Sequence, residues 1–240
     1  MISIIIPTLN EEKTIEQTIA SLNKLTDYEH EIIISDGKSK DKTIEIAKSL
    51  GAKTIIYQGT VRQTIGGGRN LGASIAGGEF LVFMDADVTL GDANKFFISA
   101  LHFFAKDKNL LGLAVRQKVA PEWATLSDRI AFGLVNISYY IQNNILHTGG
   151  SGGEFQMIRA DAFQKLKGFN ERMPAGEDND MFHRLAKLGH TRLAWPLVVW
   201  QTGRRGHKLG WIKLLSRWVI NWFSVFIFKK SHDEIWEEVR

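Results

Sequence analysis

The sequence predicts an α/β protein with a mostly parallel central sheet, helices on its faces and an amphipathic helix near its end. Short apolar runs rich in β-branched residues alternate with segments of helical spacing in the first half of the chain. Strands buried on both faces of a parallel sheet have this composition, and helices connect them. The 240 residues include 44% hydrophobic residues and only 4 Pro, so the chain is long and apolar enough for one sizeable core.

The expected strands lie at residues 2–6, 31–35, 53–57, 79–84 and 110–115. Apolar residues at helical spacing predict helices between them, near residues 15–22, 44–50, 69–77 and 96–104. A long apolar helix over roughly residues 125–146 follows, and then a glycine-rich turn at 149–153. We expect one domain at residues 1–206, with a nucleotide-binding half at 1–115 and an acceptor and catalytic half at 116–206. A basic, Trp-rich extension at 207–240 follows it.

The net charge of +4, from 30 Lys and Arg against 26 Asp and Glu, is unevenly distributed along the chain. Residues 1–180 carry 19 basic and 22 acidic side chains, whereas residues 181–232 carry 10 basic side chains, no acidic one and five Trp. This stretch predicts an anionic partner, either a membrane surface, a phosphorylated ligand or nucleic acid. A solvated basic face is the plainer alternative.

Two absences narrow the function classes further. The chain has no Cys, which excludes Cys-ligated zinc, iron–sulfur clusters and thiol nucleophiles. The first residues, MISIIIPTLNEE, lack the basic flank of a signal peptide and reach Pro and acidic residues early. We therefore expect a cytoplasmic protein.

Polar residues follow three of the expected strands, at the edge where ligands bind in open parallel sheets. The first strand runs into PTLNEE, the second into DGKSKDKT and the fourth into DAD. Asp85 and Asp87, two residues apart on extended backbone, offer the hard oxygen ligands that suit Mg²⁺ or Mn²⁺ on a diphosphate. The alternative is that these aspartates only cap the next helix. Asp36 ends its strand where a carboxylate can accept a hydrogen bond from a nucleobase.

Basic residues in two glycine-containing segments are candidates for phosphate binding. Arg69 follows three glycines, and we expect a flexible turn that brings it near a phosphate, with a plain helix entry as the alternative. Arg204 and Arg205 stand between glycines in a segment expected to form an adaptable anion clamp. His207 is a candidate third metal ligand or diphosphate contact.

Acidic residues open a further expected helix at Gly176-Glu177-Asp178-Asn179-Asp180. Acidic residues in a first turn often only complement the helix dipole. Three of them within four residues are more than a cap requires, so a carboxylate here is a candidate general base for an acceptor hydroxyl.

Taken together, these motifs resemble the family 2 glycosyltransferases of the GT-A fold, which transfer a sugar from a nucleotide-sugar donor with inversion. The resemblance covers residues 1 to about 206. It rests on IIIPTLNEE, DGKSKDKT, GGGRNLGASIAGGEFLVFMDADV, GGSGGEFQMIRADAFQKLKGFNE, GEDNDMFHRLAKLG and TGRR, in the family's order and spacing. The Q-x-x-R-W motif of processive synthases is absent from the sequence, so the resemblance implies a single transfer.

The resemblance implies a role for each matching residue. Those implied to bind the donor are Pro7, Thr8, Asn10, Glu12, Asp36, Arg69, Asp85, Ala86, Arg204 and Arg205. Asp85 and Asp87 would form a D-x-D motif that holds Mn²⁺ or Mg²⁺ on the diphosphate, with His207 as a further candidate. Asp178 would be the catalytic base, supported by Glu177. The implied partners are a nucleotide-diphosphate sugar and an acceptor that is either a hydroxyl compound or a polyprenyl phosphate.

Residues 211–228 predict an amphipathic helix, because polar residues recur at helical spacing and leave the other face apolar. Its uninterrupted apolar stretch is shorter than the roughly 20 residues needed to cross a bilayer. We therefore expect peripheral contact with the inner face of the membrane, aided by Lys229 and Lys230. Packing on the domain or in a dimer is the alternative.

Two rival functions are a non-catalytic nucleotide-sugar binding protein and a nucleotidyltransferase of similar fold. The intact Asp85, Asp87 and Asp178 count against the first. A nucleotidyltransferase is expected to carry a glycine-rich basic loop after the first strand, where PTLN stands here. Nucleic acid is not expected as a partner.

Overall fold

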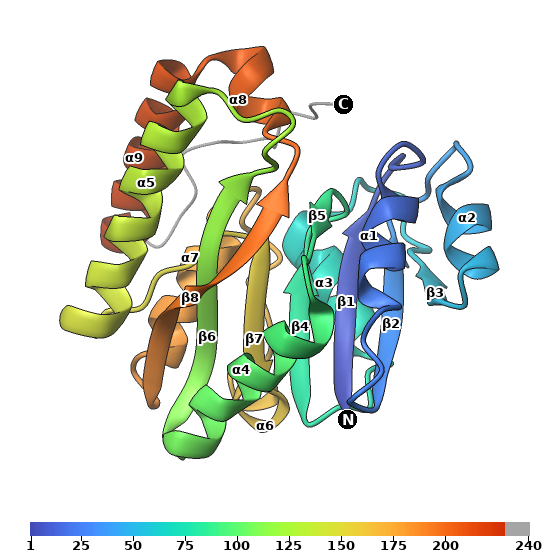
Figure 1. Cartoon of the computed structure of the whole chain (residues 1–240), viewed down its shortest axis with the longest axis horizontal. Coiled ribbons are helices and arrows are strands. Elements are labelled where there is room, and N and C mark those ends of the chain that lie inside the picture. The colour runs from blue at the N-terminus through green and yellow to red at the C-terminus, as the bar shows by residue number, and fades with distance from the viewer. Residues whose placement is uncertain (229–240) are drawn as a thin grey trace.

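The computed structural model of the chain (Figure 1) describes residues 1–228, with side chains described as far as Trp218 and at Ile220. An eight-stranded sheet runs through it in the order β3-β2-β1-β4-β7-β6-β8-β5. The strands are β1 (Ile2–Thr8), β2 (His30–Asp36), β3 (Lys53–Ile56), β4 (Phe80–Met84), β5 (Val88–Thr89), β6 (Leu110–Val119), β7 (Phe155–Arg159) and β8 (His190–Gln201). All five strands expected from the sequence are present.

Strand direction determines which residues meet at the edge of the sheet where the parallel strands end, which we call the functional edge. Pairing is parallel between β1 and β2, β1 and β4, β2 and β3, and β6 and β8. It is antiparallel between β7 and its neighbours β4 and β6, and between β5 and β8. Because β7 runs in reverse, its first residue, Phe155, pairs with Met84 at the end of β4. The loop before β7 therefore reaches the edge at which the parallel strands end.

Helices cover both faces of the sheet, and a separate helical layer stands beside it. The helices are α1 (Ile15–Leu22), α2 (Thr43–Ser49), α3 (Ile65–Ala73), α4 (Ala93–Lys106), α5 (Leu126–Tyr140) with its π-helical continuation η1 (Ile141–Ile145), α6 (Ala160–Lys165), α7 (Glu177–Leu185), α8 (Arg204–Leu209) and α9 (Trp211–Phe228). One core lies between the sheet and α1, α2 and α4, and a second lies on the other face with α6 and α7.

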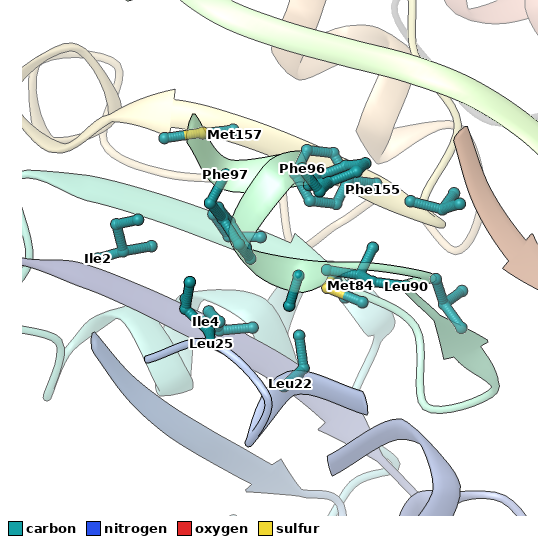
Figure 2. Packing of buried hydrophobic residues seen from close by; sticks show 14 of the residues in the cluster. Ile2, Ile4, Leu22, Leu25, Met84, Leu90, Phe96, Phe97, Phe155 and Met157 are labelled. Atoms are coloured by element: carbon teal, nitrogen blue, oxygen red, sulfur yellow. The ribbon is translucent and has the colours of Figure 1, made fainter. Parts of the chain in front are cut away.

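Aromatic side chains of α4 anchor the first core. Figure 2 shows Phe96 and Phe97 packed together with Phe155, and the rings of Phe96 and Phe155 lie 5.1 Å apart at an interplanar angle of 77°. Edge-to-face pairs of this kind add about 0.5–1.5 kcal/mol to the burial of their area. Phe155 is thereby fixed at the start of β7, next to the functional edge.

The third helix differs from the sequence prediction, because it begins at Ile65 and ends at Ala73 instead of running from residue 69 to 77. The Thr64 side chain accepts a hydrogen bond from the Gly67 N–H and caps the helix, so the glycines lie inside it. A Cβ on Gly72 would meet the Ile5 side chain at 2.5 Å. The missing side chain therefore allows α3 to lie close on the sheet, and a flexible turn at Gly66–Gly68 is wrong.

The helices α5 and α9 lie side by side at one end of the molecule, away from β1–β3 (Figure 1). The expected helices near 125–146 and at 211–228 are both confirmed. None of the helices within residues 1–228 is both long enough and apolar enough to cross a membrane. Lys229, Lys230 and the acidic chain end lie outside the described residues.

Candidate functional site

A cleft opens beyond the strand ends. Its volume of about 750 Å³ lies in the range of small-ligand sites. One end is polar and holds residues of α3, the β4 end, the loop before β7 and the start of α7. The other end lies between α5 and α9 and is lined by apolar side chains such as Phe132, Val135 and Leu215. The cleft thus joins a charged compartment to an apolar one.

Arg69 on α3 is the central contact of the polar end. Its Nη1 donates to Glu177 Oε1 at 2.7 Å, and its Nη2 donates to Asp85 Oδ1 at 3.1 Å and to the Gly153 carbonyl at 3.2 Å. The Arg69 side chain is only 1% exposed, and its guanidinium lies 5.3 Å from the centre of the Phe169 ring. The planar guanidinium therefore fixes two carboxylates from distant parts of the chain.

The glycine before Glu154 makes this arrangement possible. A Cβ on Gly153 would lie 2.5 Å from Arg69 Nη2 and 3.5 Å from Asp85 Oδ2. Only a residue without a side chain allows the backbone carbonyl to approach the guanidinium so closely.

Asp85 and Asp87 have different surroundings. Asp85 keeps 38% of its side chain exposed in the cleft, beside Arg69. Asp87 is only 9% exposed, accepts a hydrogen bond from the Thr202 hydroxyl at 2.6 Å and pairs with Arg204 Nε at 3.1 Å. Asp85 is therefore the more accessible ligand, whereas Asp87 also holds the start of α8.

Arg204 links the segment after β8 to Glu11 in the segment after β1. Its Nη1 and Nη2 donate to the two carboxylate oxygens of Glu11 at 2.8 and 3.0 Å. The expected adaptable loop is wrong, because residues 204–209 form the short helix α8, which begins after Gly203 at φ 71°. Arg204 and Arg205 both line the cleft, so the helix presents two guanidinium groups beside the aspartates.

Several carboxyl groups in the polar end of the cleft have raised pKa values. Burial, and then the charge of Asp85, raises the pKa of Glu154 to about 8. Burial and the Asp178 charge raise the pKa of Glu177 to about 8, although Arg69 opposes the shift. Burial also raises the pKa of Asp178 and that of Asp87, against the opposing charge of Arg69 at Asp178 and of Arg204 at Asp87. The polar end thus has an excess of negative charge that a cation would relieve.

Asp85 and Asp87 fit a divalent cation as a partial ligand set. Mg²⁺ and Mn²⁺ are usually held by one or two carboxylates, with substrate phosphates and water completing the shell. Among residues 1–228, no three His, Asp or Glu side chains are grouped closely enough to hold a metal by themselves. The donor set therefore fits a cation that arrives with a diphosphate.

The structure brings most of the expected site residues to the cleft. Its lining includes Pro7, Thr8, Arg69, Asp85, Ala86, Asp87, Glu177, Asp178, Arg204 and Arg205. Asn10, Glu12, Asp36 and His207 are not part of that lining in the described chain. The roles of all these residues stay predictions.

Asp36 and Asn10 support the cleft wall from behind. Asp36 is buried, and its carboxylate accepts hydrogen bonds from the Thr8 hydroxyl at 2.9 Å and from the Ser39 N–H at 2.8 Å. Asn10 Oδ1 accepts from the Lys40 N–H, and the exposed Glu12 accepts from the Lys42 N–H. These contacts tie the segment after β1 to the segment after β2.

His207 lies at a different place from the aspartates of the cleft. Its Nε2 is 2.9 Å from Asp128 Oδ2, and Asp128 also accepts a hydrogen bond from Trp211 Nε1 at 2.7 Å. This arrangement does not favour His207 as a third metal ligand, and that role stays a prediction.

Sequence reasoning missed several residues of the cleft. Glu154 and Gln201 face it, and Gln201 Nε2 donates to Glu154 Oε1 at 3.1 Å. Glu11 and Tyr139 also line it. The sequence shows only that Glu154 directly precedes a buried strand. This position predicts a place in the cleft only if that strand runs antiparallel to its neighbours.

Comparison with solved structures defines the class of fold. A mannosyltransferase of Pyrobaculum calidifontis, solved with GDP-Man and Mn²⁺, superposes with a TM-score of 0.67 at 19% identity, covering 84% of this chain and 56% of that one. Glucosyl-3-phosphoglycerate synthase of Mycobacterium tuberculosis, solved with Mn²⁺, UDP and phosphoglyceric acid, gives 0.62 at 21% identity, covering 93% and 77%. The chain has the GT-A fold of these glycosyltransferases.

Sequence comparison identifies the family. The model of glycosyl transferase family 2 matches residues 3–167, and the chain belongs to that family. A 4,4'-diaponeurosporenoate glycosyltransferase of Staphylococcus haemolyticus is 40% identical over 95 residues, which are 38% of this chain and 25% of that protein. Poly(ribitol-phosphate) beta-N-acetylglucosaminyltransferase TarS of Staphylococcus aureus is 32% identical over 155 residues, 58% of this chain and 27% of that one. The chain spans only about a quarter of the length of either relative.

Proposed function

We propose that this chain transfers one sugar from a nucleotide-diphosphate sugar to a hydroxyl or lipid-phosphate acceptor, with a divalent cation and with inversion. The observation that carries the proposal is the pairing of Arg69 with Asp85 and Glu177, at 3.1 and 2.7 Å. This pairing holds Asp85 beside the first turn of α7 at the strand ends, where ligands bind in open α/β sheets, and that supports a donor site there. Family membership supports the same reading.

The donor would bind with its diphosphate between the D-x-D motif and α8. Asp85 and Asp87 would hold the cation, and Arg204 and Arg205 supply guanidinium groups that match phosphate oxygens in shape and charge. When bound, the cation supplies positive charge against the leaving diphosphate. The guanidinium groups stabilise the same charge as the bond to the sugar breaks.

Asp178 is the residue proposed to accept the acceptor's proton. The acceptor oxygen forms a bond to the anomeric carbon while the bond from that carbon to the diphosphate breaks and its electron pair leaves with the diphosphate. The hydroxyl proton passes to the Asp178 carboxylate. Burial raises the pKa of this carboxyl, which makes its ionised form a stronger base near neutral pH. Glu177 is held by Arg69 and is proposed to position it.

A lipid-phosphate acceptor is already ionised and needs the base less. A non-catalytic nucleotide-sugar binding protein and a nucleotidyltransferase remain the rival functions. Both predict no sugar transfer by the wild-type chain, and so turnover separates them from a transferase. We propose a cytoplasmic location with peripheral membrane contact.

Nucleotide binding is the first test. The midpoint of thermal unfolding should rise for one of UDP, GDP, CDP and dTDP with Mn²⁺ or Mg²⁺, and not with EDTA. At 100 times Kd the ligand stabilises the fold by about 2.7 kcal/mol. The rise should vanish in Asp85→Ala and persist in Asp161→Ala, a control at an exposed acidic residue of α6. A chain that responds to no nucleotide would contradict the proposal.

A further inference from the structure

The outer face of α5 and η1 carries a continuous line of exposed apolar side chains, which we name the α5 stripe. It consists of Leu126, Ile130, Leu134, Ile137, Ile141 and Ile145, whose exposed fractions lie between 38% and 73%. Their spacing of three or four residues places them on one helical face. The 20 residues from 126 to 145 extend for about 30 Å. Large exposed apolar patches of this kind mark interaction surfaces.

The inner face of the same helix is already packed. Ala131 and Phe132 are buried, and the Asn136 side chain makes two hydrogen bonds of 2.9 Å with the backbone of Gln117 in β6. α5 is therefore fixed to the sheet on one side and apolar on the other. A helix that is apolar all round is normally covered on both sides.

The stripe is continuous with the apolar half of the cleft. Leu134 is 58% exposed and also lines the cleft. Beside it, Val135 of α5 faces the cleft together with Trp211 and Leu215 of α9. An apolar path therefore leads from the outer surface of α5 toward the carboxylates of the polar end.

Cationic side chains gather at one end of the stripe. Arg129 is exposed in the first turn of α5, and Lys208 and Lys213 are exposed on α8 and α9. The contacts of Asp128 with His207 and Trp211 bring α8 and the start of α9 to this turn. Asp128 itself is buried. Exposed cations beside an apolar face are the arrangement that binds anionic lipid surfaces.

We propose that the α5 stripe seats the molecule on an anionic lipid bilayer, and that the acceptor carries an apolar chain and enters the cleft from that bilayer past Leu134. The acceptor's part in this inference rests on the proposed function. A second copy of the chain seated on the stripe would cover Leu134 at the mouth of the cleft. A bilayer covers the same face and delivers the acceptor, which is why we commit to lipid.

Vesicle flotation tests the seat on the bilayer. Wild type should float with vesicles of equal parts phosphatidylglycerol and phosphatidylcholine. Ile137→Glu/Ile141→Glu should weaken this binding roughly tenfold or more, because two charges enter the interface. The matched control Ile75→Glu/Ile98→Glu changes exposed residues of other surfaces and should bind as wild type does. Equal binding by both variants, or no flotation of wild type, would overturn the proposal.

Two further measurements separate the alternatives. If wild type is a dimer that Ile137→Glu/Ile141→Glu dissociates with no change in flotation, the α5 stripe is an interface between copies and the proposal is wrong.

The entry of an apolar acceptor past Leu134 is tested by ligand binding. Dodecyl phosphate should bind more tightly than inorganic phosphate, and Leu134→Glu should reduce this difference in affinity about tenfold. If neither wild type nor any of the variants binds a nucleotide, the proposed function is rejected, but the flotation result still stands.

Discussion

Arg69 combines a structural and an electrostatic role in a single side chain. Three contacts hold it between α3, the end of β4 and α7. A buried charge without its partner is costly, and removing one partner of such a pair destabilises a protein by about 3–5 kcal/mol. The structure therefore makes the folding of the polar end depend on this guanidinium.

Arg69→Met should lower the midpoint of thermal unfolding by on the order of 10 °C, because Glu177, Asp85 and the Gly153 carbonyl lose their hydrogen-bond donor. Arg172→Met, a change at an exposed arginine, should leave the midpoint nearly unchanged. Calorimetry measures both. A loss of only a degree or two would contradict the role assigned to Arg69.

Asp178→Asn tests the proposed base. The amide cannot accept the proton, so turnover with a hydroxyl acceptor should fall by about 10²–10⁴, while nucleotide binding in calorimetric titration stays near wild type. Asp161→Asn on α6 is the matched control. A loss below about tenfold would reject Asp178 as base and would favour an acceptor that is already ionised.

Prediction of single residues from the sequence succeeded for Asp85 but not for Asp36, although both are carboxylates at the end of a buried strand. Asp85 directly follows a buried strand and does lie in the cleft. Asp36 has the same sequence context, yet its oxygens bond to Thr8 and Ser39. Thr8 is the last residue of β1 and Ser39 follows β2, and no sequence spacing shows that the two side chains meet at Asp36.

At the scale of single elements, Asp128 joins three helices. It forms a capping box with Thr125 at the start of α5, and its carboxylate also contacts His207 of α8 and Trp211 of α9. Burial raises the pKa of Asp128, but the hydrogen bonds from His207, Thr125 and Trp211 outweigh it, and the net shift is downward. The ionised form is therefore favoured by the fold.

Asp128→Ala should destabilise the protein by about 2–4 kcal/mol, because a cap and two further hydrogen-bond donors lose their acceptor. Asp92→Ala, which removes the exposed cap of α4 and a surface ion pair with Lys95, should destabilise the protein clearly less. Denaturant unfolding provides both values. Equal losses would mean that the contacts of Asp128 with α8 and α9 contribute nothing to stability.

Elements were predicted better than their ends. Apolar spacing located α1, α2 and α5, because their buried faces repeat with the helical period. It failed at α3, where Gly66–Gly68 resemble a turn but allow close packing, and at α8, where Gly203 begins a helix. Glycine permits both a turn and a close approach, and only the neighbouring elements decide between them.

At the scale of the whole molecule, the sheet topology assembles the site. Glu154 reaches the cleft because β7 is antiparallel to β4 and β6, and Gln201 reaches it at the end of β8. Strand order and direction depend on pairings far apart in sequence, which periodicity alone does not determine. The division into a donor half at 1–115 and an acceptor half at 116–206 stays a prediction.

The excess of carboxylates in the cleft should make stability depend on pH in a defined direction. Glu154 and Glu177 have a pKa of about 8 in the folded chain against an ordinary value of 4.5. The folded state therefore binds more protons than the unfolded state between these values, so the free energy of unfolding decreases as pH rises through this window. The contribution is fully present below the lower value and lost above the upper one.

Glu154→Gln isolates one share of this effect. The amide carries no titrating proton, so the variant's unfolding midpoint, measured in EDTA from about pH 5 to about pH 9, should fall less steeply than that of wild type. Glu122→Gln, a change at an exposed residue outside the cleft, should give the wild-type slope. Parallel curves for wild type and Glu154→Gln would mean that Glu154 titrates as it does in the unfolded chain. The crowding of Asp85, Glu154 and Asp178 would then store no repulsion for a bound cation to relieve.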